Sequence, residues 1–385
     1  MNIEEPDLKL FEKNYLSGKT QILFHSFSAD IHTPVSILIQ LQKEKYVFLF
    51  ESVEKGSQKG RFSVIGIRPD LIWECKNNKC LITDLVRSKK QAIDKKEPLQ
   101  SLSSFIKNNK IKLPEQLPSI SSGIFGYMGY EMIKFFENVE LNKKNSLNLP
   151  DSIFLRPSIT LVFDNVNDKI MISQLVTNDK KNNASNKFKK VKKAIYDIKK
   201  TICQPIKKKY FVEKKINKSS NIFENVKSCT TYEEFRVMVN KAKKYIYEGE
   251  IFQVVLSRVF KKKINVSPIS IYRSLRYLNP SPYLFFMDFK NFSIVGSSPE
   301  ILVKLEGKDV TIRPIAGTRK RGKNKNEDEK LKNELINDPK ELSEHLMLLD
   351  LGRNDISRVS QAGTVKVTDK MYVEFFSHVM HIVSN

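Results

Sequence analysis

The sequence has little cysteine, a single tryptophan and no long apolar run. Four cysteines in 385 residues, at positions 75, 80, 203 and 229, do not make the disulfide framework of a small secreted domain. No stretch approaches the roughly 18 apolar residues that a transmembrane helix needs. The opening residues, MNIEEPDLKLFEKNY, lack the apolar core of a secretory signal. These absences argue against a secreted scaffold and a membrane span, and they favour a reducing cytoplasm.

Motifs for zinc and for nucleotides are also missing. Cys75 and Cys80 have no second cysteine pair, so the spacing does not support a zinc site. The chain contains no P-loop and no GxGxxG, the glycine-rich loops that hold phosphate groups. The sequence therefore predicts neither a zinc module nor a common nucleotide-binding domain.

Acidic residues are too few to balance the basic ones. Lys and Arg number 66 against 43 Asp and Glu, which gives a formal net charge of +23. Such an excess is typical of nucleic-acid-binding proteins. Much of it lies in residues 179–209, where Lys occurs together with Asn, as AT-rich coding sequences favour. We interpret most of the excess as compositional drift, and a basic binding module that retains an enzyme-derived fold is the rival hypothesis.

The remaining composition suits a folded protein with a large core. Hydrophobic residues make up 40% of the chain, and the length predicts about two domains. Short runs rich in Val, Ile and Phe predict strands within residues 20–75, 118–135 and 153–164. The segments 158–164 and 169–176, joined by an NVND turn, predict a β-hairpin. We therefore predict an α+β fold with extensive antiparallel sheet, whose first domain covers residues 1–178.

Residues 179–222 are predicted to be a Lys/Asn-rich linker or surface helix. Within them, apolar residues recur three and four positions apart over residues 188–202, which predicts a basic amphipathic helix. Two interpretations stay open for this helix. It either covers the first domain, or it binds a membrane surface or nucleic acid.

The second predicted domain covers residues 223–385. Thr231 and Glu234 form a capping-box pattern, which predicts a helix that ends at Gly249. A strand is predicted over residues 251–260, and a hairpin is predicted around residues 306–309. Asp338 followed by Pro339 predicts a further helix start.

Three groups of residues in this domain are candidates for chemistry. Glu341 and Glu344 lie three apart on the predicted helix with His345 beside them, so they either bind a hard cation or form a solvated face. The run 314–319 ends in Gly317, Thr318 and Arg319, which suits carboxylate or phosphate recognition but also an ordinary strand-to-loop transition. His378 and His381 are too few for a metal site, and either a catalytic or a core histidine remains open.

Eight segments taken together match a known family in its order and spacing. They are FLFESVEKGSQKGRFSVIG (48–66), GIFGYMGYE (123–131), GEIFQVVLSR (249–258), LNPSPYLFF (278–286), VGSSPE (295–300), PIAGTRKRG (314–322), KELSEHLMLLDLGRND (340–355) and SHVMHIVS (377–384). The chain resembles the component I family of anthranilate synthases, within the chorismate-utilising enzymes.

The resemblance implies an activity, a metal and a partner. The family condenses chorismate with ammonia in an Mg2+-dependent reaction that releases pyruvate and leaves anthranilate, the first step of tryptophan synthesis. A separate glutamine amidotransferase subunit supplies the ammonia, and tryptophan is the feedback inhibitor. The resemblance therefore implies a cytoplasmic lyase of amino-acid biosynthesis, without a membrane and without nucleic acid.

The resemblance also assigns roles to individual residues. Glu344 matches a catalytic Mg2+ ligand, and His381 matches an active-site histidine beside the ring. Gly317 and Thr318 match substrate-contact positions. The tryptophan pocket is matched by Glu51, Ser52, Arg61, Pro282 and Tyr283.

Two positions separate the sister enzymes of the family. Some aminodeoxychorismate synthases carry a nucleophilic Lys where this chain has Ala316, which cannot act as a nucleophile. Isochorismate and salicylate synthases place a Lys base where this chain has Gln253, and an amide cannot act as a base. Aminodeoxychorismate synthase component I of the folate pathway remains the alternative.

The family pattern continues for about another hundred residues beyond the last matched segment. The resemblance implies that a chain ending at Asn385 is a C-terminal truncation with an incomplete catalytic region. It would lack a second Mg2+ glutamate and the strands that complete the catalytic sheet. We expect such a polypeptide to be inactive on its own and poorly soluble, because sheet edges would be exposed.

Overall fold

The computed structural model describes residues 7–52, 60–86, 89–90, 94–141, 147–178, 183–207, 210, 224–376 and 378–385. The chain divides into two compact units. The larger unit comprises Met1–Ile206 and Pro268–Asn385, and the smaller unit comprises Lys207–Ser267.

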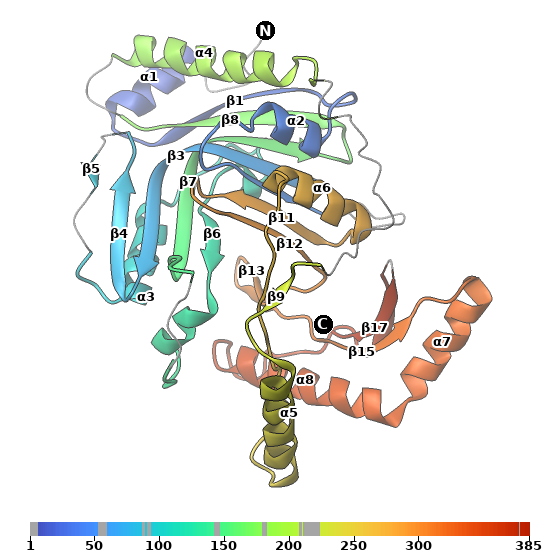
Figure 1. The fold of residues 1–385 in the computed structure, drawn as a ribbon. Helices are drawn as coiled ribbons and strands as arrows, with labels where there is room; N and C mark the ends of the chain where they lie inside the picture. The colour runs from blue at the N-terminus through green and yellow to red at the C-terminus, as the bar shows by residue number, and fades with distance from the viewer. Residues whose placement is uncertain are drawn as a thin grey trace. The chain divides into compact units, whose positions relative to one another are not determined.

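A large antiparallel sheet dominates the larger unit (Figure 1). Among the described residues it has ten strands, with a main order of β1-β8-β7-β3-β2-β11-β12, while β4 pairs with β3, β5 with β4, and β6 with β7. The strands are β1 (Gln21–Ser28), β2 (Phe48–Glu51), β3 (Phe62–Lys76), β4 (Lys79–Asp84), β5 (Lys89–Lys90), β6 (Phe125–Met128), β7 (Ser152–Asp164), β8 (Lys169–Val176), β11 (Tyr283–Asp288) and β12 (Ser293–Ser298). The predicted α+β fold with extensive antiparallel sheet is confirmed.

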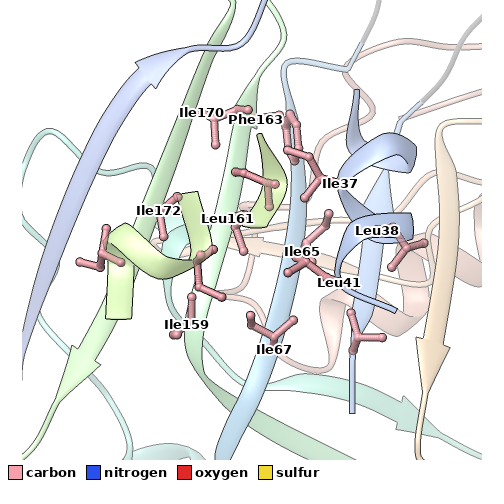
Figure 2. Close-up of a cluster of buried hydrophobic side chains, with 14 of the residues drawn as sticks. Ile37, Leu38, Leu41, Ile65, Ile67, Ile159, Leu161, Phe163, Ile170 and Ile172 are labelled. Atoms are coloured by element: carbon pink, nitrogen blue, oxygen red, sulfur yellow. The ribbon is translucent and has the colours of Figure 1, made fainter. Parts of the chain in front are cut away.

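Alternation along the strands places two hydrophobic layers on opposite faces of this sheet. Leu49, Ile65 and Leu161 belong to one core cluster, whereas their neighbours Phe48, Val64 and Val162 belong to another. Successive side chains of a strand point to opposite faces, so strands buried on both faces are apolar throughout. Figure 2 shows the first layer, where Ile37, Leu38 and Leu41 pack over strand residues.

Helices cover this first layer. They are α1 (Leu8–Leu16), α2 (Pro34–Gln40), α4 (Ala184–Ile202) and α6 (Pro268–Leu278), and each contributes buried residues to the same core cluster. Helix α4 buries Val191, Ile195, Ile198 and Ile202, so the basic amphipathic helix predicted over residues 188–202 is confirmed as a cover of the sheet. No helix in the described ranges is both long and apolar enough to cross a bilayer.

Smaller elements complete the larger unit. Helix α3 (Pro98–Asn108) and the 3-10 turns η1 (Ser119–Ser121) and η2 (Tyr130–Phe135) follow β5 in the chain. The C-terminal part contains the hairpin β13 (Lys304–Glu306) and β14 (Asp309–Thr311), helices α7 (Lys325–Asn337) and α8 (Pro339–Ser357), and a three-stranded sheet of order β15-β17-β16. Its strands are β15 (Ile315–Lys320), β16 (Tyr372–Phe375) and β17 (Val379–Val383).

The large sheet crosses the domain boundaries expected at residues 178 and 222. Strands β11 and β12 come from beyond residue 222, yet β11 pairs with β2, with Leu284 opposite Glu51 and Met287 opposite Phe48. Buried edges of a sheet need a partner strand for their backbone groups, and β11 supplies it for β2. The expected boundaries stay a prediction, and the predicted hairpin of residues 158–176 is confirmed as β7 and β8.

The smaller unit contains helix α5 (Tyr232–Tyr247) and the short pair β9 (Lys227–Ser228) and β10 (Phe260–Lys261). The capping box at Thr231 is confirmed, because its hydroxyl accepts from Glu234 N while the Glu234 carboxylate accepts from Thr231 N. The strand predicted over residues 251–260 is wrong, since only Phe260 at its end is in a strand. Apolar β-branched residues there find no partner ladder among the described residues, and β propensity depends on such pairing.

A buried ion pair ties β3 to β7. Asp70 is the extra residue of a bulge in β3, between Pro69 and Leu71, and Leu71 lies opposite Arg156 of β7. The guanidinium donates to both carboxylate oxygens, with Arg156 Nε 2.7 Å from Oδ1 and Nη2 2.6 Å from Oδ2. Both side chains are about nine-tenths buried. Removing one partner would leave the other as an uncompensated buried charge.

We therefore expect Arg156→Ala to lower the free energy of unfolding by about 3–5 kcal/mol. Urea unfolding followed by circular dichroism measures this change. Lys332→Ala is the control, because its ion pair with Glu329 is far more exposed and should contribute less than about 1 kcal/mol. Equal losses in the two variants would contradict the stabilising role of the buried pair.

Candidate functional site

The candidate site is built on a bulge in β15. Strand β15 pairs with β17, with Ala316 opposite Ile382 and Thr318 opposite His381, so Gly317 is the extra residue. Its φ of +79° lies in the left-handed region, which glycine adopts without a steric penalty. A Cβ added at Gly317 would lie 3.1 Å from Ile382 Cδ1 and 3.3 Å from Glu341 Oε2. Glycine thus lets the β15 backbone approach the side chains of β17 and α8.

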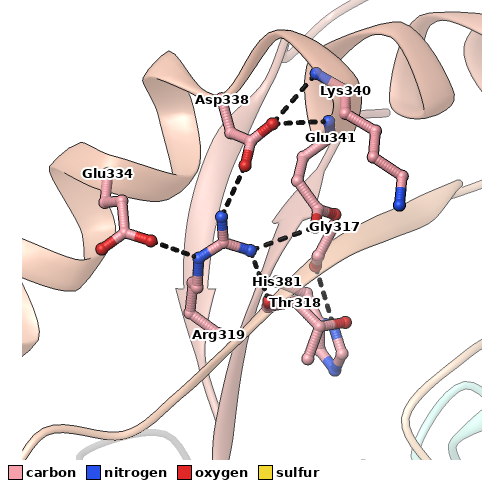
Figure 3. Close-up of polar contacts among 8 residues, drawn as sticks. All are labelled: Gly317, Thr318, Arg319, Glu334, Asp338, Lys340, Glu341 and His381. Atoms are coloured by element: carbon pink, nitrogen blue, oxygen red, sulfur yellow. Dashed lines mark hydrogen bonds and ion pairs between the residues drawn. The ribbon is translucent and has the colours of Figure 1, made fainter.

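The bulge orients His381. Its Nδ1 lies 3.1 Å from the carbonyl oxygen of Gly317 and 3.1 Å from Thr318 Oγ1 (Figure 3). A carbonyl oxygen only accepts, so Nδ1 carries the proton that is donated to Gly317. In the neutral ring, Nε2 is then the nitrogen with the lone pair. The structure therefore brings together three residues that the sequence singled out, and it leaves Nε2 of His381 with the capacity to take a proton.

Helix α8 begins as the sequence predicts. Asp338 is the N-cap, and its carboxylate accepts from the backbone N–H groups of Lys340 and Glu341. Pro339 occupies the first helical position, where its missing N–H costs nothing. Glu341 and Glu344 are both partly buried on this helix, and Glu341 faces Gly317.

Arg319 joins β15 to both helices. Its guanidinium donates to Glu334 at 3.0 Å, Asp338 at 2.6 Å and Glu341 at 3.0 Å (Figure 3). The hydrogen bonds that Arg319 donates to these three carboxylates raise its pKa, and the guanidinium holds the pKa of Asp338 below its usual range. Carboxylate recognition by Arg319 was left open by the sequence, and the structure shows carboxylates of the chain itself as its partners. Arg319 therefore fixes α8 beside β15.

His345 and His378 differ from His381 in their surroundings. His345 is fully buried in α8, and its Nε2 lies 2.8 Å from Ser384 Oγ. Burial lowers the pKa of His345, and the nearby Ala316 backbone opposes part of that fall. His378 is exposed, and its Nε2 donates to the carbonyl of Leu278 at the end of α6. The two histidines that the sequence considered together, His378 and His381, thus contact different elements.

Protein carboxylates alone do not form a metal cage in the described part of the chain. There, no three His, Cys, Asp or Glu side chains gather so that they could hold a metal ion. Mg2+ typically keeps several waters and takes only one or two protein carboxylates together with substrate oxygens. Glu344 supplies one partly buried carboxylate on α8, and its role as a ligand stays a prediction.

Four of the five predicted pocket residues meet where β2 ends and β11 begins. Glu51 lies opposite Leu284, and on this register Ser52 and Tyr283 follow as the next neighbours, with Pro282 one residue earlier. Gly60 packs directly against Ser52. The side chain of Arg61 instead reaches Asp164, with Nη2 3.2 Å from Oδ2. Tryptophan binding by these residues stays a prediction.

Sequence reasoning missed the partners of Glu51. This carboxylate is buried at 5% exposure and accepts from the Tyr272 hydroxyl and from Arg276 Nε, the latter at 2.7 Å. Burial, followed by the charge of Glu51, raises the pKa of Tyr272. Tyr272 and Arg276 lie four apart on α6, which indicates a shared helix face. Their partner lies more than 200 residues earlier, where no local pattern points to it.

Comparisons with known proteins agree with this architecture. A family model described as chorismate binding enzyme matches residues 46–385. Anthranilate synthase component 1 of Cereibacter sphaeroides is 40% identical over 378 residues, covering 97% of this chain and 75% of that protein. The same-named protein of Aquifex aeolicus is 36% identical over 386 residues, covering 100% of this chain and 76% of that protein.

A solved structure shares both the fold and part of the sequence. The crystal structure of anthranilate synthase component I from Streptococcus pneumoniae superposes with a TM-score of 0.70 at 30% sequence identity, covering 86% of this chain and 70% of that one. The family match spans most of the chain, including both strands of the β15–β17 site. The chain therefore belongs to the chorismate-binding enzyme family.

Proposed function

We propose that the protein is component I of an anthranilate synthase. In this role it converts chorismate and ammonia to anthranilate and pyruvate, as a lyase at the first step of tryptophan synthesis. The observation that carries the proposal is the bulged β15–β17 pair, where Gly317, Thr318 and His381 meet beside α8. Relatives named anthranilate synthase component 1, similar over nearly the whole chain, support it.

Each residue of the site has a distinct part in this proposal. Gly317 brings the β15 backbone close to Glu341 of α8, and the exposed Thr318 offers its hydroxyl for a hydrogen bond to a substrate oxygen. His381 exchanges a proton with the ring through Nε2, because Nδ1 is committed to the Gly317 carbonyl. An imidazole suits this task because its ring nitrogens can accept and donate a proton.

The proposal assigns Mg2+ to Glu344. A hard cation prefers carboxylate oxygen, and the cation would neutralise the ring carboxylate of chorismate and polarise the ring for loss of its hydroxyl. Glu344 is partly buried on α8 and lies one turn from Glu341, which is tied to Arg319. Arg319 thereby helps to orient the helix that carries Glu344.

Two sister activities use residues that this chain lacks. Ala316 is buried on β15 and has no group to attack the ring, unlike a lysine at that position. Gln253 stands where water-activating sisters place a lysine base. Aminodeoxychorismate synthase remains the alternative, and nucleic-acid binding driven by the +23 charge is a remote one.

The proposal also includes a source of ammonia and a feedback inhibitor. A glutamine amidotransferase subunit is the expected ammonia source, in keeping with the component 1 name of the relatives. Tryptophan is the expected inhibitor, bound where Glu51 and Ser52 meet Pro282 and Tyr283. We expect this activity in the cytoplasm.

Product identity decides between the two amination reactions. The purified protein is incubated with chorismate, ammonium and Mg2+. Anthranilate, detected by fluorescence and chromatography, supports the proposal. Aminodeoxychorismate as the product would replace it with the alternative.

His381→Ala should lower kcat by about 10²–10⁴-fold, the usual contribution of a general acid or base. Steady-state rates of anthranilate formation measure this. His378→Ala is the matched control, since that imidazole contacts Leu278 rather than Gly317, and it should keep kcat within about threefold of the unmodified protein. Similar kcat values for the two variants would remove His381 from the proposed chemistry.

Metal removal tests the role of Glu344. EDTA should abolish anthranilate formation, and added Mg2+ should restore it. Glu344→Gln should raise the Mg2+ concentration for half-maximal rate by more than about 100-fold, beyond the 10- to 100-fold typical of residues that only orient a ligand. Glu329→Gln, an exposed carboxylate on α7, serves as the control. An unchanged Mg2+ requirement in Glu344→Gln would refute the assignment.

Ser52→Arg should weaken feedback by placing a long charged side chain into the predicted tryptophan pocket. We expect the tryptophan concentration for half inhibition to rise at least about 10-fold, which corresponds to about 1.4 kcal/mol of binding. Inhibition curves at fixed chorismate measure it. Ser103→Arg, on the exposed face of α3, controls for added charge. If both variants keep the original half-inhibitory concentration, the pocket lies elsewhere.

A further inference from the structure

A buried hydrogen-bonded clasp connects α8 to the three-stranded sheet. His345 and Ser384 are both 0% exposed, and His345 Nε2 lies 2.8 Å from Ser384 Oγ. Ser384 directly follows β17, and its Oγ also accepts from the backbone N–H of Met371, at 2.9 Å, just before β16. Three separate parts of the chain therefore meet at one buried hydroxyl.

The protons of this clasp can be assigned by elimination. The Met371 N–H only donates, so Ser384 Oγ accepts there and has its own hydrogen left to donate. That hydrogen goes to His345 Nε2, because a buried hydroxyl seeks a partner for its hydrogen. The neutral ring then carries its proton on Nδ1. Nδ1 has no partner in hydrogen-bond geometry among the described residues and lies near the backbone of Ala316, the residue before Gly317.

The clasp constrains the rotation of α8 about its own axis. Neighbouring residues of an α-helix point about 100° apart, so a fixed ring at His345 fixes the direction of Glu344. Arg319 holds the first turn of α8 through Asp338 and Glu341. At the other end, Gly352 allows close packing, because a Cβ there would lie 2.3 Å from Ile312 Cδ1. Between the Arg319 contacts and Gly352, the buried hydrogen bond of His345 to Ser384 is the contact that fixes a direction on the helix.

We propose that His345 is a positioning residue, which sets the rotation of α8 so that Glu344 faces the edge formed by Gly317 and His381. This inference rests on the proposed function, because it takes Glu344 and His381 as parts of one site. In this role His345 stays neutral and acts only through its hydrogen bond with Ser384. It does not exchange protons with substrate.

Replacement of the ring tests this role without relying on activity alone. Mn2+, which occupies hard oxygen sites, is titrated into the protein without chorismate, and free Mn2+ is followed by electron paramagnetic resonance. His345→Leu should raise the Mn2+ Kd at least 10-fold, together with the Mg2+ concentration for half-maximal rate. Ser384→Ala should reproduce both shifts, because it removes the same hydrogen bond from the other side.

Two further variants separate positioning from stability. His345→Gln places an amide oxygen near the former Nε2, so it should recover the Mn2+ Kd to within about threefold. Leu349→Ala, one helical turn further on and also buried, should lower Tm while leaving the Mn2+ Kd unchanged. The positioning role is refuted if His345→Leu and Leu349→Ala raise the Mn2+ Kd equally. It is also refuted if the Mn2+ Kd of His345→Gln is as high as that of His345→Leu.

The outcome for Glu344 distinguishes this inference from the function on which it rests. Loss of Mn2+ binding in Glu344→Gln, with a normal Kd in His345→Leu, upholds the metal site and overturns the clasp. If the unmodified protein binds no Mn2+ and needs no Mg2+, both the metal assignment and the clasp fall. If His345→Leu does not fold, Ser384→Ala and His345→Gln still give the decisive comparison.

Discussion

The pairing of β2 with β11 is the contact on which the larger unit depends. Four residues of β2 pair with four of β11, although the two strands lie more than 200 residues apart in the chain. This ladder continues the large sheet into β12 and carries α6 onto its face, where Tyr272 and Arg276 bind the buried Glu51. Long-range strand pairing is entropically costly to form. Here the entropic cost is offset by apolar packing on both faces of the sheet and by the hydrogen bonds to the buried Glu51 carboxylate.

A second, local constraint shapes the candidate site. The bulge at Gly317 turns the β15 carbonyl toward His381 and lets Glu341 approach the backbone. Arg319, two residues on, gathers three carboxylates and holds α8 against the strand. Catalytic geometry needs such support, because a side chain is useful only when its neighbours fix its direction. One short strand therefore sets the tautomer of His381 and anchors helix α8.

Local patterns predicted many elements correctly. The capping box at Thr231, the N-cap at Asp338 and the amphipathic helix α4 follow from short-range hydrogen bonding and apolar spacing. The strand predicted over residues 251–260 failed because its apolar run has no partner ladder among the described residues. Likewise, Arg319 was open to interpretation as a ligand-binding guanidinium, since Glu334 and Asp338 are brought to it only by the fold.

The fold class, the family and the residues that can take part in chemistry were predictable from the amino-acid sequence, because motif spacing and strand alternation are properties of the chain. Which of those residues lie together depends on the three-dimensional fold. In the folded protein, the bulge in β15 places Gly317 beside His381, and His345 is buried against Ser384. The Glu51 carboxylate pairs with Arg276 of α6. Such contacts link positions tens to hundreds of residues apart. No local propensity encodes them, because they arise from packing elements whose pairing is decided by the whole core.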